Sequence, residues 1–331
     1  MILFIPRITQ MPRHEGQIHR ALHFLCGAMA ILIAIIALSA APGWAAEQAI
    51  FPSPQQAVSA LVNAIKNDND VELINILGST AEGLVSSGDK VADQNGKARF
   101  LKAYGEKYSF EQEDSGKVTL LIGDKSYPFP IPLVQQGDTW FFDTQSGMEE
   151  ILNRRIGRNE LHTIQVMQAY TNAQREYACL IRDDGPPTFA QKLASTEGKK
   201  DGLYWETETG ERESPLGPLV AKAVKKGYMA GLNENTDTPF RGYLYKILKS
   251  QGKHANGGAF DYIIDDKMIL GFALVAYPAK YGASGIMTFI VNQEGLVYEK
   301  DLGAKTSILA AAMTTFDPDS TWEKYLDPAD Q

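Results

Sequence analysis

The sequence predicts an α+β protein with two successive parts. Helices followed by a curved antiparallel sheet are expected first, and a long helix packed on a four-stranded antiparallel meander is expected second. Three observations predict this class: helix-start signals after residue 53, a long helical repeat after residue 147, and strand-like runs between residues 242 and 303. Because domains commonly hold ~100–200 residues, we expect an N-terminal domain over 46–145, a C-terminal domain over 146–326 and a tail over 327–331.

Residues 1–45 are predicted to be a secretory signal peptide. Three arginines and one glutamate lie in residues 1–20, residues 21–41 are almost continuously apolar, and small residues follow up to Ala46. A basic, an apolar and a small-residue region in this order are typical of signal peptides. Cleavage after Ala45 or Ala46 would release a periplasmic or secreted protein. Uncleaved, the run approaches the ~20 residues that span a bilayer and would anchor the chain in the inner membrane; Met11 is an alternative start to Met1.

The charge of the mature chain excludes one class of partner. Loss of residues 1–45 removes three arginines and one glutamate, so the formal net charge changes from −8 to −10. Such an acidic chain lacks the basic surface typical of nucleic-acid binding, and no nucleic-acid partner is expected. The expected partner is an unknown envelope protein or polymer. Membrane contact is expected only through the N-terminal segment if it stays uncleaved, and the sequence does not define the oligomeric state.

The N-terminal part begins with a helix that Ser53 caps and Pro54 opens. Val71–Leu77 is expected to form a second helix, ended by Gly78, and Ser79–Glu82 has the pattern of a capping box. A third helix and four strands complete this part: Asp93–Lys107, then Tyr108–Gln112, Lys117–Ile122, Phe129–Val134 and Thr139–Asp143.

Gly147–Asp183 is predicted to be the helical stretch that joins the two parts. Gly157 is expected to break it, because glycine is a poor helix former. Cys179, late in this stretch, is expected to be a small core residue, and a short helix is expected over Phe189–Ala194. The core-facing stripe of the long helix consists of Val166, Tyr170, Ala173 and Tyr177.

The C-terminal sheet is predicted from five runs. In the first, Phe260, Tyr262 and Ile264 alternate with Asp261, Ile263 and Asp265, a period of two that suits a strand with one buried face. Met268–Tyr277 is apolar on both faces and is expected to form a central strand. Ile286–Val291 and Leu296–Lys300 flank a hairpin turn at residues 292–295. Gly242–Leu248 adds a further strand upstream.

The two parts resemble known folds. The helices and curved sheet of the first part, ending in GDTWFFD, resemble the nuclear-transport-factor-2-like superfamily. The helix IQVMQAYTNAQREY and the strands YLYKIL, FALVAYP and GIMTFIVNQEGLVY resemble a type IV pilin or pseudopilin. Another domain stands where pilins carry their filament-forming helix, so this resemblance implies a fold and not filament assembly.

A larger set of motifs resembles one family over nearly the whole mature chain. ILNRRIGRNEL (151–161), KDGLYW (200–205), ESPLGPL (213–219), the stretch from AFDYI to EKDLG (259–303) and FDPDSTW (316–322) resemble the bacterial exported family catalogued as domain of unknown function 2950. The resemblance extends from Phe51 to Trp322. It implies no established activity and no catalytic residue.

Residue counts argue against metal and thiol chemistry. After signal cleavage the chain keeps two histidines, His162 and His254, and one cysteine. A Cys/His zinc site needs three or four such ligands, and Cys179 and His162 would lie ~25 Å apart along one helix. No metal, cofactor or catalytic residue is therefore predicted.

The densest polar cluster is the candidate ligand site. Arg154 and Arg158 lie one helical turn apart with Arg155 beside them, and Asn159 follows. Guanidinium groups suit a carboxylate or a phosphate. The alternative is that these arginines pair with neighbouring glutamates, namely Glu149, Glu150 and Glu160.

Three aromatic residues extend the candidate site: Tyr204, Trp205 and Tyr281. On a surface they would stack on sugars or peptides, and core packing is the alternative for at least half of them. The sequence as a whole predicts an exported, non-catalytic binding or assembly module of the cell envelope. The alternative is an envelope hydrolase that uses paired carboxylates in an interdomain cleft, drawn from Asp261, Asp265, Glu294, Glu299 and Asp301.

Overall fold

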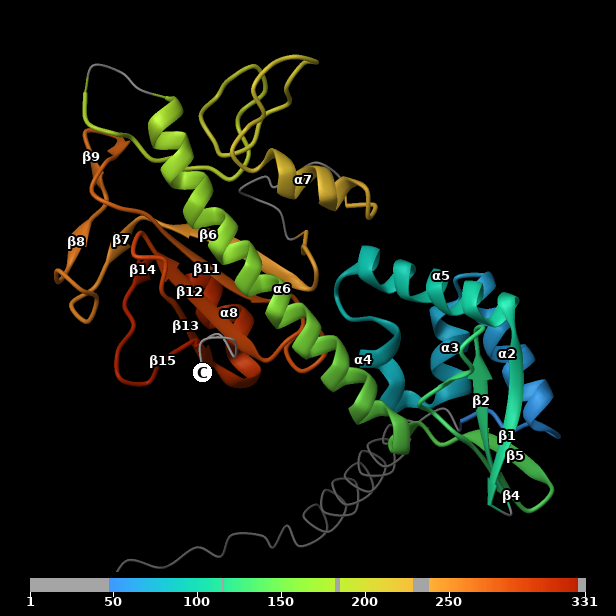
Figure 1. Cartoon of the computed structure of the whole chain (residues 1–331). Coiled ribbons are helices and arrows are strands. Elements are labelled where there is room, and N and C mark those ends of the chain that lie inside the picture. The colour runs from blue at the N-terminus through green and yellow to red at the C-terminus, as the bar shows by residue number, and fades with distance from the viewer. Residues whose placement is uncertain (1–47, 115, 182–184, 229–237, 327–331) are drawn as a thin grey trace, which may run out of the picture. The chain divides into compact units, whose positions relative to one another are not determined.

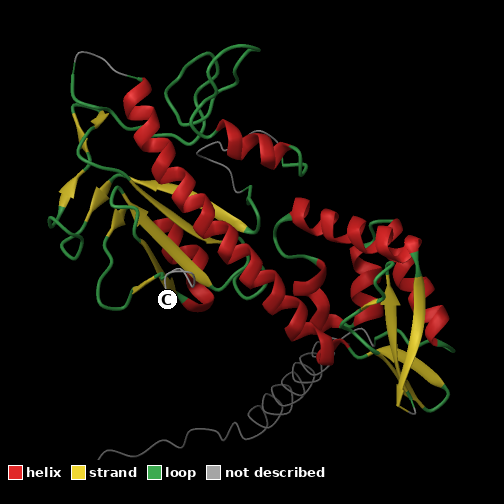
Figure 2. Ribbon diagram, in the orientation of Figure 1, coloured by secondary structure: helices red, strands yellow, loops and turns green. Residues whose placement is uncertain are grey.

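The computed structural model describes residues 48–114, 116–181, 185–228 and 238–326 (Figure 1). The predicted signal peptide or anchor and the predicted tail at 327–331 lie outside these residues. Helices occur together with several mainly antiparallel sheets, so the predicted α+β class is confirmed (Figure 2). Residues from Gln48 onward form one compact unit with two large clusters of buried apolar side chains. The division into domains at residue 146 stays a prediction.

The first cluster is formed by residues 57–142. Helix α2 (Pro54–Lys66) begins where predicted, because the Ser53 hydroxyl accepts a hydrogen bond from the Gln56 amide at 3.3 Å. Its buried face, which includes Leu61, packs against α3 and α5. The remaining helices of this part are α3 (Asp70–Leu77), the 3-10 helix η1 (Ser79–Ala81), α4 (Glu82–Val85) and α5 (Lys90–Glu106).

An antiparallel sheet completes this cluster, with the order β1-β2-β4-β5 and β3 paired to β2. Leu120, Leu133 and Phe142 are its most deeply buried side chains, each at 1% exposure. The strand predicted over Phe129–Val134 begins only at Leu133, because the prolines before it cannot donate ladder hydrogen bonds. The strands are β1 (Tyr108–Asp114), β2 (Lys117–Ile122), β3 (Tyr127–Pro128), β4 (Leu133–Gln136) and β5 (Thr139–Phe142).

Helix α5 differs from its neighbours in one respect: none of its side chains is fully buried. It contacts α2 and β2, so its inward face is covered only in part. Asp89 caps the helix by accepting a hydrogen bond from the Ala92 amide at 2.9 Å, so that α5 begins at Lys90, three residues before the predicted start. An inward helix face without a closely packed partner indicates open space beside it.

Helix α6 (Thr144–Leu180) has 37 residues and contacts both clusters. Ile151 packs on the first, and the predicted stripe through Tyr170 and Tyr177 is buried in the second. The predicted break at Gly157 is wrong, because the helix continues through it. One glycine costs a helix about 1 kcal/mol, which the packing of a long helix offsets.

The second cluster lies between α6 and a five-stranded antiparallel sheet of order β15-β13-β12-β11-β6. The predicted meander corresponds to four of these strands, and α6 contacts β11 and β12 (Figure 1). Val275 and Ile290, paired across β11 and β12, are fully buried. The strands are β6 (Tyr243–Leu248), β11 (Ala273–Pro278), β12 (Met287–Asn292), β13 (Val297–Asp301) and β15 (Glu323–Lys324).

Short elements surround this sheet. β14 and β8 pair with β7 in a small sheet, and β9 pairs with β10. Helix α7 (Gly217–Val224) was not predicted from the sequence. The other short elements are β7 (Ser250–Gln251), β8 (Phe260–Asp261), β9 (Ile263–Ile264), β10 (Lys267–Met268), η2 (Gly303–Lys305), α8 (Thr306–Ala312) and β14 (Thr315–Phe316).

Four further local predictions are wrong. Met268–Tyr277 is not one strand, because at Gly271 the backbone packs against the Tyr262 ring, where a Cβ would approach to 2.8 Å. Phe189–Ala194 is not helical, and the Phe189 amide donates to the Met268 carbonyl at 2.7 Å. No side chain caps η1 or α4, contrary to the predicted capping box. Cys179 is exposed, because it lies one position beyond the buried stripe.

Candidate functional site: a cationic cavity beside helix α6

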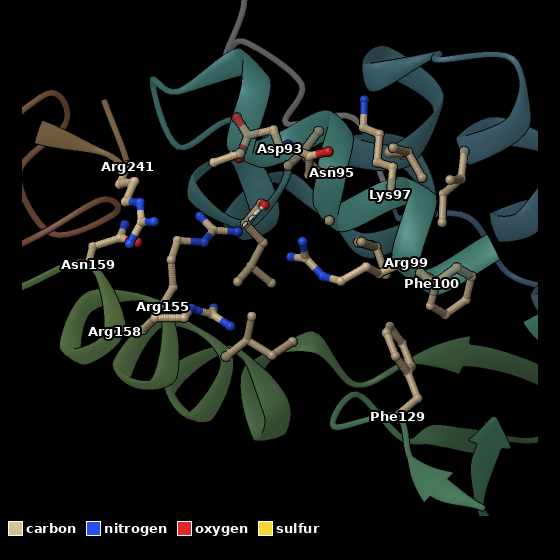
Figure 3. A pocket seen from close by; sticks show the side chains of 18 of the residues that line it. Asp93, Asn95, Lys97, Arg99, Phe100, Phe129, Arg155, Arg158, Asn159 and Arg241 are labelled. Carbon is tan, nitrogen blue, oxygen red and sulfur yellow. Dashed lines mark hydrogen bonds between the residues drawn. The ribbon is translucent and has the colours of Figure 1, made fainter. Parts of the chain in front are cut away.

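A cavity of about 420 Å³ lies beside the unburied face of α5. Small-molecule sites commonly measure about 300–1,000 Å³, so the volume suits a small ligand. Residues from α2, α3, α4, α5 and α6 line it, together with residues that follow α7 and one that precedes β6. Figure 3 shows the side chains that project into this space.

One wall of the cavity is apolar. Its side chains belong to the first buried cluster or pack against its edge. In Figure 3 the rings of Phe100 and Phe129 lie together at one side of the cavity, and their centroids are 5.5 Å apart. The aliphatic members of this wall are Leu61, Ile65, Leu73, Leu77, Leu84, Val85, Ile131 and Ile151, and Ala92 of α5 also lines the cavity.

The other wall is cationic. Six lysine or arginine side chains line the cavity, whereas Asp93 is the one carboxylate among the described lining residues. Lys97 is paired with Asp68, in the turn after α2, and with Asp70, at the start of α3. The other five cations are Arg99, Arg155, Arg158, Lys226 and Arg241.

Arg155 is the best-anchored of these cations. Its guanidinium donates to the carbonyl oxygens of Gly83 at 2.7 Å and Leu84 at 2.6 Å. Burial lowers its pKa, attraction to Asp93 opposes this shift, and repulsion from Arg158 adds to it. An arginine stays charged in a protein, so α6 holds a fixed positive charge at this wall.

Asp93 attracts Arg155 and is also bonded to the turn before α5. Burial raises the pKa of its carboxyl group, although the Ser87 amide donates to its Oδ2 at 2.9 Å and Arg155 attracts it. The carboxylate is thus shared between this turn and Arg155. One such group cannot balance the positive charges around the cavity.

The positive charges around the cavity lower the pKa values of His162 and Lys226. Burial, followed by repulsion from Arg241, Lys226 and Arg158, lowers the pKa of His162 to about 4. Repulsion from Arg241, burial and repulsion from Arg99 lower the pKa of Lys226. Like charges placed together disfavour a further positive charge, so the cavity is electropositive and His162 is neutral at pH 7.

Arg241 is held in an unusual backbone conformation. Its φ angle is +54°, in the left-handed region that non-glycine residues adopt at a cost. Its buried Nε finds no hydrogen-bond partner among the residues that the structure describes. A buried donor that lacks a partner costs roughly 1–3 kcal/mol. Backbone strain and an unpaired donor together at a cavity wall are the features expected of a residue positioned for a ligand.

A hydrogen-bonded frame fixes the cationic wall. The Asp89 Oδ2 accepts from the Tyr228 hydroxyl at 2.8 Å and from the Gly242 amide at 2.7 Å. The Tyr228 oxygen in turn accepts from the Arg241 amide at 3.2 Å. The N-cap of α5 therefore positions the backbone that carries Arg241.

Three of the arginine-cluster residues predicted from the sequence lie at this cavity. Arg155, Arg158 and Asn159 line it, and the Asn159 amide is anchored by donation to the Ser284 carbonyl at 2.9 Å. Arg154 is not a lining residue; its side chain is exposed and paired with Glu150, as the alternative expected. Glu160 does not pair with these arginines but accepts from backbone amides of β12 and the preceding residue.

The three predicted aromatic residues do not line the cavity. Trp205 is buried and meets the Tyr177 ring edge-on at a centroid distance of 6.5 Å. Tyr204 packs, half-buried, against the second cluster. Tyr281 donates to Asp301 at 3.1 Å. Core packing accounts for the first two, and the three residues form no common surface with the arginine cluster.

Sequence reasoning missed the cations that other segments bring to the arginine cluster. Arg99 comes from α5, Lys226 from the turn after α7 and Arg241 from the turn before β6. The spacing of Arg155 and Arg158 on one helix was visible, but no sequence signal connects residues 226 and 241 to them. Only a weak indication of these cations is present in the sequence: basic runs such as residues 222–226 interrupt an otherwise acidic chain.

Among the described residues, no group of three or more His, Cys, Asp or Glu side chains could hold a metal ion. None of the five carboxylates proposed for a hydrolase lines the cavity, and Asp265 lies in a turn at positive φ. No described helix has the length and apolar character to span a bilayer.

These features define an α+β protein with an electropositive, partly apolar cavity. Residues 48–325 match the family model described as "Protein of unknown function (DUF2950)", and the chain belongs to this family. Comparison with curated proteins gives no significant match, and neither does comparison with solved structures.

Proposed function

We propose that the protein is a non-catalytic binding module that holds an anionic ligand in the cavity beside α6. The observation that carries the proposal is the convergence of Arg155, Arg158 and Arg241, from segments far apart in the chain, on a space lined by one carboxylate among the described residues. Uncompensated like charges destabilise a folded protein. A ligand anion would supply the missing counter-charge.

The lining groups favour binding over catalysis. Hydrolysis of a glycosidic bond by carboxylates needs two of them roughly 5–9.5 Å apart. Asp93 is the one carboxylate among the described lining residues, and its amide partner and burial tie it to the turn before α5. Arginines that hold a ligand need no such pair.

We further propose that this binding takes place in the cell envelope. The basic, apolar and small-residue regions of residues 1–45 support export, either with cleavage or as an inner-membrane anchor. The packing of α6 on the β6-β11-β12-β13 sheet supports the pilin-like arrangement, and the helices over the first sheet support the nuclear-transport-factor-2-like one. Both arrangements serve here as scaffolds for the cavity.

Thermal unfolding in inorganic phosphate tests the proposal. Phosphate and chloride are compared at equal ionic strength for the wild type, the double variant Arg158→Gln/Arg241→Gln and the control Arg154→Gln, whose side chain is exposed outside the cavity. Phosphate also stabilises proteins by exclusion from their surface. Binding at the cavity is therefore measured as the difference between variants in the rise in Tm that phosphate causes.

The wild type and Arg154→Gln should gain the same rise in Tm, and the double variant should lose at least half of it. At a concentration about ten times Kd, binding contributes roughly 1.4 kcal/mol, which corresponds to a few degrees. An equal rise in all three proteins would show that the cavity arginines hold no anion.

A further inference from the structure

We infer that the ligand of this cavity is an amphipathic anion, with a carboxylate or phosphate head on an aliphatic chain. The inference rests on the proposed function and specifies its ligand class. It comes from the lining of the cavity, in which aliphatic and aromatic side chains of the first buried cluster lie beside lysine and arginine side chains, in part on the same helices.

The aliphatic wall offers contact but almost no hydrogen bonds. Leu61, Leu73 and Leu77 are members of the first buried cluster, and Phe100 and Phe129 extend it. Burying polar groups such as sugar hydroxyls or a nucleobase edge against such a wall is unfavourable, because their hydrogen bonds to water are not replaced. A hydrocarbon chain is stabilised there by roughly 25 cal/mol for each Å² removed from water.

Most of the cationic side chains lie toward the other side of the same space, whereas Arg99 lies beside Phe100 (Figure 3). In Figure 3 Asn159 and Arg241 lie opposite the rings of Phe100 and Phe129, and the side chains of Arg155 and Arg158 rise from α6 between these two sides. The Nε of Arg241 is buried without a partner among the described residues. An acidic head would therefore bind at the Arg241 side, with its chain toward the two phenylalanines.

Helix α5 contributes both kinds of lining. Ala92, Gly96 and Phe100 line the cavity beside Lys97 and Arg99 of the same helix, and none of its side chains is fully buried. A bound aliphatic chain would cover the Phe100 ring, whereas a ligand that is charged throughout would leave this ring in water.

Calorimetric titration of the full chain with three probes tests the inference. Decanoate carries both features of the proposed ligand, decanol carries the chain without charge, and acetate carries the charge without a chain. Decanoate is expected to bind with one-to-one stoichiometry and at least about tenfold more tightly than either of the other probes, which corresponds to ~1.4 kcal/mol.

Two variants locate the site. Phe100→Ser should weaken decanoate and leave acetate unchanged, whereas Arg241→Gln should weaken both anions; Arg154→Gln is the matched control and should change neither. Circular dichroism spectra and thermal melts of each variant establish that it is folded. Because Phe100 is only half-buried, a folded Phe100→Ser protein is expected.

The outcomes separate the inference from the proposed function. If acetate binds as tightly as decanoate and both depend on Arg241, the aliphatic chain is irrelevant and the inference falls, while the anion site stands. If decanol matches decanoate and Arg241→Gln changes neither, both the inference and the proposed function fail. If no probe binds, the inference is overturned, and the phosphate melts decide the proposed function.

Discussion

The hydroxyl of Tyr228 donates a hydrogen bond to the buried carboxylate of Asp89 at 2.8 Å, across 139 residues of sequence. The same carboxylate caps α5 through the Ala92 amide and accepts from the Gly242 amide. Asp89 therefore links the start of α5 to the turn that presents Arg241. Burial, followed by interaction with Asp89, raises the pKa of Tyr228, so the hydroxyl stays protonated and able to donate.

Removal of this link should destabilise the protein strongly. Asp89→Ala loses a helix cap, worth ~1 kcal/mol, and leaves two buried donors without an acceptor at roughly 1–3 kcal/mol each. We expect the free energy of unfolding in urea to fall by about 3–7 kcal/mol. Tyr228→Phe should cost about 1–2 kcal/mol, and Ser53→Ala, which removes an exposed cap, about 1 kcal/mol. Equal losses for Asp89→Ala and Ser53→Ala would show that Asp89 acts only as a cap.

Two glycines of α6 should respond oppositely to alanine. A Cβ at Gly147 would overlap the Pro130 carbonyl and lie 2.8 Å from the Ile131 nitrogen, whereas a Cβ at Gly157 would meet nothing within 4 Å. Gly147→Ala is expected to lower the free energy of unfolding by about 2–3 kcal/mol through overpacking. Gly157→Ala should raise it by about 0.5–1 kcal/mol, because alanine is the better helix former. A destabilised Gly157→Ala protein would show that the helix needs flexibility there.

The depressed pKa of His162 should appear in the pH dependence of stability. The unfolded histidine titrates near its ordinary value of 6.5, whereas the folded one titrates at about 4. Between these values the unfolded chain binds more protons, so stability is lost as the pH falls from 6.5 toward 4. The groups that lower this pKa, in addition to burial, are Arg241, Lys226 and Arg158.

Urea unfolding of the wild type and His162→Gln at several pH values tests this expectation. The stability of the wild type relative to His162→Gln should decrease as the pH falls. A His162→Gln protein with the unchanged slope would contradict the shifted pKa.

Loss of one cavity cation should stabilise the ligand-free protein while weakening anion binding. Lys226→Gln removes repulsion from Arg241 and Arg99. Because Lys226 is exposed and screened, a gain of only up to about 0.5 kcal/mol is expected at low salt, and 1 M salt should abolish it. The neighbouring Lys225, which does not line the cavity, provides the matched control. If Lys225→Gln and Lys226→Gln change stability and phosphate binding equally, repulsion among the cavity cations is not the cause of these changes.

Local signals predicted most of the elements. The Ser53 cap, the stripe through Tyr170 and the hairpin after β12 depend on neighbouring residues, and the structure contains all three. The failures arise where distant residues decide. Gly271 ends an apolar run because the Tyr262 ring lies against it, and Gly157 stays helical because α6 packs along its length.

The candidate site, too, could be predicted only as far as local sequence signals reach. Arg155 and Arg158 could be grouped from the sequence because helical spacing places them on one face. Arg241 joins them only through tertiary contacts, which Asp89 and Tyr228 organise. The cavity itself could not be predicted, since it results from an unburied face of α5 whose sequence resembles that of an ordinary surface helix.

The most direct test of an amphipathic anion site is a crystal structure of the protein with ω-bromododecanoate, in which anomalous scattering locates the bromine. The account predicts one molecule in the cavity, with its carboxylate beside Arg158 and Arg241 and its bromine beside Phe100 and Phe129. A cavity left empty at saturating ligand, or a bromine at the arginine side with the carboxylate elsewhere, would contradict it.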